Sequence, residues 1–537
     1  MFDYDKFYKE TTVDCNSDPT RFARIASLCK GHVLDIGCCF ALLSDYYSGD
    51  YTGVDFSEEA LKKAREVRRS NANFMLRDCS DLSDFVFNKF DTIVITEFLE
   101  HFENDDKILN PIFQNAKPGT RIIVTCPNGP RVPDPSHLRE LTIPALRKRF
   151  SPYGKVKFYN WPGANRQIMM TCDIGEKNEN LLSLVMIVKD EEKGIESAVL
   201  SCIDYVDNIV IAVDKSSTDK TLELAKLYAD TLKTFDWQDD FSWARNFAHE
   251  GVETKWILFL DGHEYISEFK EFDKLLNSKA EGLMASVELE NGFVFPNPRI
   301  YRNGVQFEGK IHEKQMCKNV EFCPAFRIKH NRVGTQSSAA IDFRRKQNDD
   351  MVPRLLGEEL KKNKKNVRAL FHLGLYWEAR EQYKKALSFY RRYLKLADNN
   401  QERWFVLFHC ALCAIPLNRN FLAFSYACSA ELEMPNRWEI QKLKGMIFYS
   451  NKKYEKAIVY FVDSLSNNTV ANLYRPWIRK DSETWNFIGE AFCYIKNYEK
   501  ANIAFDRAAS LCNEKEKKDF LEKRAKLMKD IFIQSVK

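Results

Sequence analysis

Hydrophobic and polar positions follow two different periods in the first third of the chain. From Gly31 to about Asn160, short runs of β-branched and other apolar residues alternate with segments whose apolar positions recur every three or four residues, such as SEEALKKAREVRRS. The short runs are HVLDIG, YTGVDF, DTIVITE and TRIIVTC. Strands that alternate with helices in this way predict a parallel sheet with helices on both faces.

The pattern then changes twice along the chain. Residues 164–182 include the polar stretch IGEKNEN and are the best candidate for a linker. A second alternation follows, with the apolar runs SLVMIVK, DNIVIAVD and KWILFLDG, and it predicts a second α/β domain. After about Ala340 the strand pattern stops, and helical periodicity continues to the C-terminus.

The helical part repeats a pattern of small and aromatic residues. In each of four units a small residue is followed twelve positions later by an alanine. Four positions after that alanine stands a residue that fills the space beside it. This spacing resembles the tetratricopeptide pattern, in which small residues recur where paired helices cross closely. The alternative is a generic helical bundle. The aligned residues are Gly374, Ala386 and Tyr390; Ala411, Ala423 and Ala427; Gly445, Ala457 and Phe461; and Gly489, Ala501 and Phe505.

The repeats are not evenly spaced. Their central alanines are 37, 34 and 44 residues apart, so we expect an insertion over residues 467–481, before the last repeat. The charged segment 514–532 is expected to form a helix with a polar outer face that caps the solenoid.

Length and composition exclude several classes of protein. A chain of 537 residues exceeds the roughly 250–300 residues at which one core stops growing, so several domains are expected. The net charge of +4 gives no whole-chain reason to expect nucleic acid as a partner. Fifteen cysteines without framework spacing favour a reduced, cytoplasmic compartment. Neither a signal peptide nor a membrane span is expected, because no apolar run is long enough.

Two carboxylates stand where strands of the first alternation end. The run VLDIG carries Asp35 and turns tightly at Gly37, where backbone amides can meet a nucleotide-like ligand. The next strand ends in Asp55, whose carboxylate can accept both hydroxyls of a ribose. This series resembles the class I S-adenosylmethionine-dependent methyltransferases, which have a Rossmann-like α/β fold. The resemblance implies that Asp35 and Gly37 line the methionine end of the cofactor, Asp55 holds the ribose, Asp78 lies near the adenine, and Glu97 with His101 follows the fourth strand.

One departure concerns the glycine loop of that family. The family usually reads G-x-G-x-G, whereas this chain reads Gly37-Cys38-Cys39-Phe40-Ala41, so two glycines that permit positive φ are replaced. The alternative to an active methyltransferase is therefore a retained fold that no longer methylates. The later stretch PDPSHLRELT resembles the acceptor side of the same family, which makes its histidine, His137, a candidate base or acceptor contact; a structural histidine is the alternative.

The second α/β region carries the groups that sugar transfer from a nucleotide diphosphate requires. Asp261 and His263 stand at alternate positions after an apolar strand, so they share one face and both can reach a single cation. The order MIVKDEE, VDKSSTDKT, DDFSWARN and FLDGHEY resembles the family 2 glycosyltransferases of the GT-A fold, whose motif is usually D-x-D. The resemblance implies that the nucleotide sugar is bound by Asp190, Asp214, Asp240, Arg245 and Asp261.

The stretch PRIYRNGVQFEGKIHEKQ also resembles this family. The resemblance implies that His312 is a third metal ligand and Glu313 the general base, with Glu308 as the competitor for that role. The alternatives are that the imidazole of His312 only packs in the core and that Glu308 and Glu313 are surface acids.

The leading hypothesis is a cytoplasmic, metal-dependent and inverting glycosyltransferase, whose cation is Mn²⁺ or Mg²⁺. Its acceptor, possibly a peptide or protein, would be presented by the repeats, and the last two regions resemble peptide S-glycosyltransferases of the sublancin type. The first domain would use S-adenosylmethionine to methylate the sugar or the acceptor. One alternative is a methyltransferase whose other domains only bind, and another is a repeat-based scaffold with relic catalytic domains.

The expected fold is thus α/β, followed by α/β and an all-α solenoid. The expected segments are a class I methyltransferase-like domain (1–163), a linker (164–182), a GT-A domain (183–337), a connecting helix (338–365) and tetratricopeptide repeats with a capping helix (366–537).

Overall fold

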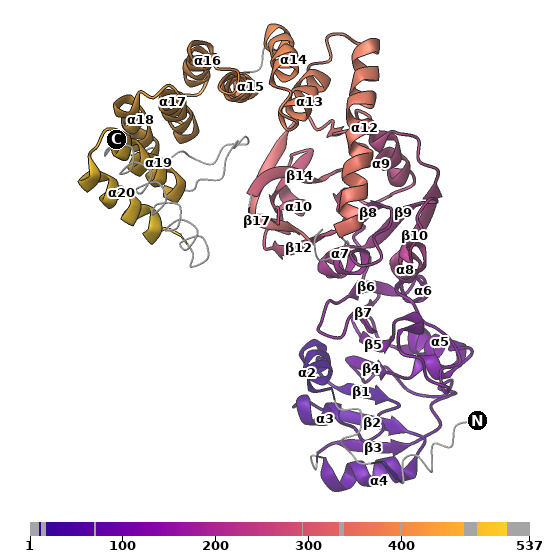
Figure 1. The fold of residues 1–537 in the computed structure, drawn as a ribbon. Coiled ribbons are helices and arrows are strands. Elements are labelled where there is room, and N and C mark those ends of the chain that lie inside the picture. The colour runs from indigo at the N-terminus through magenta and orange to yellow at the C-terminus, as the bar shows by residue number, and fades with distance from the viewer. Residues whose placement is uncertain are drawn as a thin grey trace. The chain divides into compact units, whose positions relative to one another are not determined.

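The computed structural model describes residues 10–11, 18–68, 71–290, 292, 294–331, 338–397, 400–466 and 481–512. The chain divides into two compact units, which are drawn in Figure 1. No helix in these ranges is both long and apolar enough to cross a membrane. The first unit comprises Met1–Gly309 with Glu313–Ala340, and the second comprises Lys310–His312 with Ile341–Lys537.

The first unit begins with a seven-stranded sheet of order β3-β2-β1-β4-β5-β7-β6. Its first five strands pair in parallel, which confirms the architecture that the alternating pattern predicts. The last two strands pair antiparallel. The strands are β1 (Val33–Ile36), β2 (Tyr51–Asp55), β3 (Asn73–Leu76), β4 (Thr92–Thr96), β5 (Arg121–Pro127), β6 (Gly154–Phe158) and β7 (Gln167–Ile174). The helices are α2 (Pro19–Leu28), α3 (Leu43–Tyr46), α4 (Glu58–Val67), η1 (Leu99–His101), α5 (Asp106–Asn115), η2 (Gly129–Arg131) and α6 (Ile143–Phe150).

The predicted linker over residues 164–182 is wrong, because residues 167–174 in the middle of this stretch form a strand of the sheet. Strand β7 runs from Gln167 to Ile174 and pairs with both β5 and β6. All of its residues except the first are buried, since the strand lies inside the sheet. Only residues 175–181 connect it to the strand that begins at Leu182, so the polar letters IGEKNEN mark a short connection rather than a domain boundary.

The second sheet has eight strands in the order β10-β9-β8-β11-β14-β13-β17-β12. Strands β8 to β11 pair in parallel, so their carboxyl ends meet at one edge of the sheet. The strands are β8 (Leu182–Val188), β9 (Asn208–Asp214), β10 (Thr231–Phe235), β11 (Trp256–Phe259), β12 (Glu264–Phe269), β13 (Gly282–Glu288), β14 (Val294–Arg302) and β17 (Val320–His330), with a separate pair β15 (Phe307–Glu308) and β16 (Lys314–Gln315). The helices are α7 (Ile195–Cys202), α8 (Thr221–Tyr228), α9 (Phe241–His249) and α10 (Lys274–Asn277).

The two sheets of the first unit share one hydrophobic core. Buried aliphatic and aromatic side chains of both sheets belong to a single cluster, and α6 of the first domain contacts α8 of the second. Arg147 donates to Asp230 at 2.9 Å, and Arg131 donates to Glu196 at 2.9 Å. The two α/β domains therefore form one continuous body.

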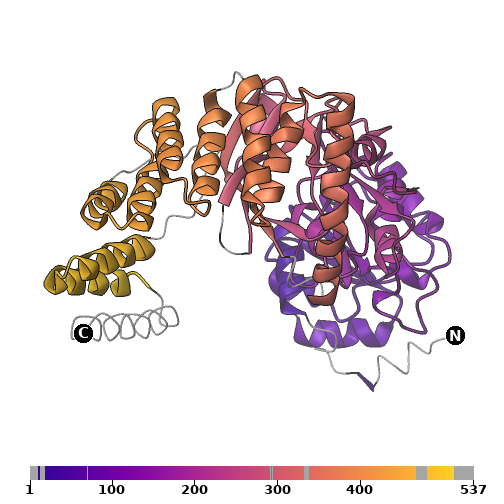
Figure 2. The same cartoon turned by 45° about the horizontal axis from the view of Figure 1, so that its top comes forward.

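The second unit is helical, as the repeat pattern predicts. Within it, α13 packs on α14, α15 on α16, α17 on α18 and α19 on α20, and Figures 1 and 2 show these helices in pairs. The expected insertion, apart from Asp481, and the expected capping helix lie outside the residues that the structure describes. The helices are α12 (Ser338–Lys362), α13 (Val367–Glu378), α14 (Tyr383–Leu396), α15 (Asn400–Ala414), α16 (Asn420–Glu433), α17 (Trp438–Ser450), α18 (Tyr454–Ser466), α19 (Asp481–Tyr494) and α20 (Tyr498–Ser510).

The small residues of the repeat stand where an aromatic ring of the paired helix presses against the backbone. A Cβ atom added to Gly374 would lie 2.2 Å from the ring of Tyr390. The corresponding distance is 2.5 Å between Gly445 and Phe461. These close approaches explain why the pattern places glycine and a ring sixteen positions apart.

Replacing Gly445 by alanine is expected to lower the free energy of unfolding of the helical unit by about 1–3 kcal/mol, because the new methyl group overlaps the ring of Phe461. Gly357 in α12 is the matched control, since an added Cβ there meets no atom within 4 Å. The Gly357→Ala change is expected to stabilise by about 0.5–1 kcal/mol through helix propensity. Hydrogen exchange over the pair α17 and α18 measures the first effect and exchange over α12 measures the second, and equal effects of the two substitutions would contradict this packing.

Candidate functional site

The loops that follow β8, β9 and β11 meet at the carboxyl edge of the second sheet. Asp190, directly after β8, accepts hydrogen bonds from the backbone N–H of Thr218 at 2.7 Å and from its hydroxyl at 3.2 Å. A Cβ atom on Gly194 would lie 2.2 Å from the carbonyl oxygen of Gly262, so the loops after β8 and β11 touch backbone to backbone. The predicted nucleotide-sugar residue Asp190 thus ties two of these loops together.

Two other predicted nucleotide-sugar residues also organise their own segments. Asp214 ends β9, is buried, and accepts from the backbone N–H of Ser216 at 2.9 Å. Asp240 is the N-cap of α9, where it accepts from the backbone N–H of Trp243 at 2.9 Å. Contact of either carboxylate with a nucleotide stays a prediction.

Arg245 links two predicted site carboxylates that lie far apart in the sequence. Its Nη2 is 3.7 Å from the Oδ1 of Asp261, and its Nε donates to Oε1 of Glu313. The guanidinium group lies over the ring of Phe259, 3.5 Å from the ring centre, and is shielded from solvent. Helix α9, the end of β11 and the segment before β16 therefore contribute one charged centre.

His263 lies beside a different acid. It is buried, and its Nδ1 is 3.4 Å from Oε1 of Glu191. A Cβ atom added to Gly262, which separates Asp261 from His263, would be 2.7 Å from Cγ of Glu191. The acid after β8 therefore packs over the turn that carries the predicted metal ligands.

A buried network that the sequence did not predict lies directly behind this turn. Glu264 is 1% exposed and accepts from Arg299 at 2.6 Å and from the backbone N–H of Asp261 at 3.0 Å. His330, at the end of β17, lies 2.8 Å from the same carboxylate. The sequence could have indicated Glu264, because it is an acid that directly follows the motif DGH. Its partners come from distant strands, so the sequence could not have indicated them.

The donors at this edge fit a divalent cation. Asp261 and His263 supply one carboxylate and one imidazole, and Glu191 adds a second carboxylate against the same turn. Among the described residues, the ligand atoms of Asp261, His263 and Glu191 do not all lie within 4.8 Å of one another. A cation held at this edge would therefore complete its shell with phosphate oxygens and water.

The remaining predicted residues of this domain occupy two different settings. Glu308 lies exposed on β15, opposite Lys314 of β16. His312 belongs to the second unit, where its ring stacks on His372 of α13 with centres 4.2 Å apart. Burial, with a smaller contribution from His312, lowers the pKa of His372 well below its ordinary value. The role of His312 as a third metal ligand stays a prediction.

In the first domain, the altered glycine loop keeps the backbone shape that glycines allow. Cys39 has a φ of 50° and Ala41 a φ of 51°, and both stand where the family motif has glycine. The backbone N–H of Cys39 donates to Asp55 at 2.8 Å, which fixes the loop against the end of β2. The retained left-handed backbone fits a loop that approaches S-adenosylmethionine.

Replacing Cys39 by glycine is expected to raise the free energy of unfolding by about 0.5–1 kcal/mol. The change relieves the strain of a left-handed backbone, about 1–2 kcal/mol, and this exceeds the cost of the larger conformational entropy that glycine gives to the unfolded chain. Cys29 is the matched control, since its φ of −68° is open to any residue. The Cys29→Gly change is expected to destabilise. Thermal unfolding of both variants tests the sign, and destabilisation by Cys39→Gly would refute the strain.

The other predicted cofactor residues lie around this loop. Asp35 is buried and accepts from the hydroxyl of Tyr51 at 2.7 Å; burial raises the pKa of Asp35 to about 7. Gly37 has a φ of 69°, and a Cβ atom there would lie 2.5 Å from the ring of Phe98. Asp78 is exposed, so it is open to a ligand.

Glu97 closes the far side of this region. It accepts from Thr125 at 3.0 Å and from Gln167 of β7 at 2.8 Å, so the strand that replaces the predicted linker also positions a predicted site residue. Whether Glu97 contacts a cofactor stays a prediction.

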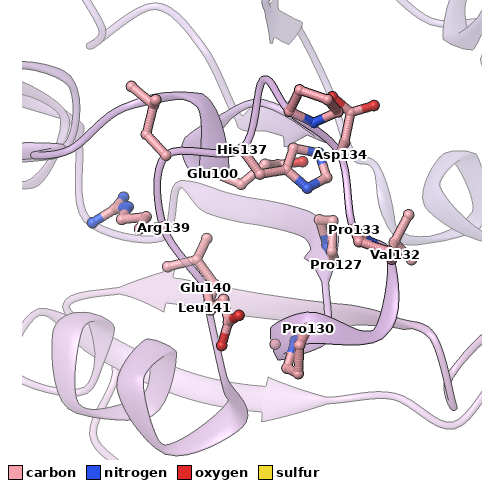
Figure 3. A pocket seen from close by; sticks show the side chains of 13 residues that line it. Glu100, Pro127, Pro130, Val132, Pro133, Asp134, His137, Arg139, Glu140 and Leu141 are labelled. Carbon is pink, nitrogen blue, oxygen red and sulfur yellow. The ribbon is translucent and has the colours of Figure 1, made fainter.

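A cavity of about 490 Å³ opens beside the carboxyl ends of β4 and β5. His137, which the sequence placed on the acceptor side, is on its wall together with Glu100. Figure 3 shows Glu100, His137 and Asp134 together on one side and Pro130 on the opposite side. Burial, with a contribution from Glu97, raises the pKa of Glu100 to about 8.

Comparison with protein families matches both α/β domains. A methyltransferase domain model matches residues 29–182, and a glycosyl transferase family 2 model matches residues 183–331. The boundary between the two models falls next to the start of β8 at Leu182.

Curated relatives match each region separately. The SPbeta prophage-derived glycosyltransferase SunS of Bacillus subtilis is 27% identical over 258 residues, which are 44% of this chain and 58% of the relative. The ubiquinone biosynthesis O-methyltransferase of Coxiella burnetii is 31% identical over 103 residues, 18% of this chain and 44% of the relative. A TPR repeat-containing protein of Synechococcus elongatus is 40% identical over 83 residues, 16% of this chain and 20% of the relative.

The chain thus spans little more than half the length of the glycosyltransferase relative. The family matches support sugar transfer as the activity of the second domain. With the paired helices of the second unit, they show that the chain is a fusion of a methyltransferase domain, a family 2 glycosyltransferase domain and tetratricopeptide repeats.

Proposed function

We propose that the protein is a metal-dependent, inverting glycosyltransferase that moves a sugar from a nucleotide-sugar donor to an acceptor. The observation that carries the proposal is the contact of buried Arg245 with both Asp261 and Glu313. It brings the acid of the cation motif and the candidate base to one place, at the edge where the parallel strands end. Ligands of open α/β sheets bind at that edge.

Donor binding in this proposal uses the loops that follow β8, β9 and β11. Asp190 and Asp214 stand on the first two loops, so they are suited to the nucleoside, and Asp261 stands on the third. Asp261 and His263 would hold the divalent cation. When bound, such a cation neutralises the charge that develops on the leaving diphosphate.

The base in this proposal is Glu313 rather than Glu308. Glu313 is shielded and is oriented by Arg245, whereas Glu308 is exposed on β15. Glu313 would take the proton of the acceptor nucleophile as the new bond forms on one face of the sugar. The bond to the diphosphate breaks on the opposite face, so the anomeric configuration inverts.

The acceptor in this proposal is a peptide or protein bound by the repeats. Repeat solenoids build extended surfaces that suit an extended chain. The resemblance of the last two regions to peptide S-glycosyltransferases supports this choice, and the SunS relative is itself named a glycosyltransferase.

A second activity, methyl transfer from S-adenosylmethionine to the sugar or the acceptor, is favoured by two features of the first domain. The loop of Gly37 keeps its left-handed backbone, and a cavity lies beside β4 and β5. Asp35, Gly37 and Asp55 would hold the cofactor, whose chemistry is the donation of a methyl group. Two sites in one compact unit can act in turn on a tethered acceptor at raised effective concentration.

The test is a screen of nucleotide sugars for hydrolysis by the full chain with Mn²⁺, with and without S-adenosylmethionine. At least one donor is expected to be hydrolysed, and hydrolysis by an Asp261→Ala variant is expected to fall at least about tenfold. If the Asp261→Ala variant hydrolyses the donor as fast as the wild type, the sugar-transfer proposal is wrong. That result would favour a methyltransferase whose other domains only bind. Failure of every donor and of S-adenosylmethionine to stabilise the chain would favour the scaffold.

A further inference from the structure

Glu100 is a buried carboxylate that the proposed reactions do not use. It follows β4 in the short helix η1, is 1% exposed, and lies on the wall of the 490 Å³ cavity. Within the described ranges, neither of its side-chain oxygens accepts a hydrogen bond. A buried carboxylate is normally paired, hydrogen-bonded or bound to a metal, because its desolvation is otherwise uncompensated.

Two imidazoles meet this carboxylate. One ligand atom each of Glu100, His101 and His137 lies within 4.8 Å of the others, and this is the three-ligand group found in the described part of the chain. The rings of His101 and His137 have centres 5.2 Å apart at an angle of 61°. His137 comes from the segment after β5, so the group joins two loops at the carboxyl edge of the first sheet.

The surroundings orient His101 for ligation. Its Nδ1 is 3.1 Å from the carbonyl oxygen of Ser136, which can only accept a hydrogen bond, so Nδ1 carries the proton and Nε2 is the ring nitrogen that has a lone pair. Metal-binding histidines typically donate their other ring nitrogen to a carbonyl or a carboxylate in this way. Ser136 is next to His137, so one loop both supplies a ligand and positions another.

We propose that Glu100, His101 and His137 bind a divalent transition-metal ion at one side of this cavity. Two imidazoles and one carboxylate suit ions such as Zn²⁺, Mn²⁺ or Co²⁺ better than Mg²⁺, which prefers oxygen ligands. This site lies in the first domain and is separate from the cation predicted at Asp261.

The cavity gives such an ion a partner. Glu100 and His137 both line it, so a molecule in the cavity can reach an ion held between them. Three protein ligands leave coordination positions open for that molecule or for water. We therefore expect the cavity to favour molecules that offer an oxygen atom to the ion. This expectation rests on the proposed methyl transfer, whereas the binding of the ion does not.

The test is a titration of the metal-free full chain with Co²⁺, followed by visible absorption and by thermal unfolding. Glu100→Gln and His137→Ala are each expected to weaken Co²⁺ binding at one site at least tenfold. Glu140→Gln is the matched control, because Glu140 lines the same cavity outside the ligand group. His263→Ala is expected to leave this site unchanged, which separates it from the cation predicted in the second domain.

Thermal unfolding gives a readout that does not depend on activity. Without metal, Glu100→Gln replaces a buried side chain whose oxygens accept no hydrogen bond within the described ranges, and it is expected to unfold at about the same temperature as the wild type. Added Co²⁺ is expected to raise the unfolding temperature of the wild type and of Glu140→Gln by more than that of Glu100→Gln, in which only the cation site predicted at Asp261 remains. Equal Co²⁺ binding by Glu100→Gln and Glu140→Gln, or an equal rise in unfolding temperature, would overturn the proposal.

Discussion

Sugar transfer by a Glu313→Gln variant is expected to fall by about a hundred- to ten-thousandfold, the usual contribution of a general base. Glutamine has the shape of glutamate and can still accept a hydrogen bond from Arg245, so the change removes the base and leaves the centre packed. The turnover number with a saturating donor measures the loss.

Glu308→Gln is the control for this result. Glu308 is an acid of the same segment, but it is exposed and stands outside the contact with Arg245. Its replacement is expected to change the turnover number less than about threefold, in line with the small effects of most exposed substitutions. If Glu308→Gln lowers the turnover number strongly and Glu313→Gln lowers it little, Glu308 and not Glu313 is the base.

Replacing Glu264 by alanine is expected to lower the free energy of unfolding of the second sheet by about 3–5 kcal/mol, because it leaves a buried guanidinium without its partner. Arg299 is 7% exposed and donates to Glu264 at 2.6 Å. The same carboxylate holds the backbone N–H of Asp261, so the turn that carries the cation motif is expected to loosen as well.

Glu268, on the same strand β12, is the matched control. Its partners are Lys270 and Arg327, whose side chains are 78% and 60% exposed. Removing such a surface acid changes stability by about 0–1 kcal/mol. Hydrogen exchange over β11 and β12 separates the two variants, and a small effect of Glu264→Ala on that segment would mean that Arg299 finds another partner.

The sequence predicted the elements whose signal is local. Strands that end in an acid, as at Asp55 and Asp214, appear as a short apolar run followed by a charge, and the structure has these acids at strand ends. The repeat spacing worked for a similar reason, because Gly445 and Phe461 must meet whenever the two helices pair. Periodicity and fixed spacing are properties of neighbouring positions.

Contacts made across long separations were not predictable in this way. Arg245 and Glu313 are 68 positions apart, and the network of Glu264 draws Arg299 and His330 from other strands of the same sheet. Strand β7 was missed because its apolar run lies beside a polar connection. Which strands become neighbours depends on the packing of the whole sheet, and a single sequence without homologues carries little information about it.

The continuous core beneath the two sheets limits how this protein can be divided. Cutting the chain between residues 175 and 181 would expose apolar surface on both products, although the two halves match different families. Fragments expressed alone would therefore be prone to precipitate, and a substitution that unfolds one transferase would reduce the cellular amount of the other. Because they share this core, the two α/β domains are expected to fold and unfold together.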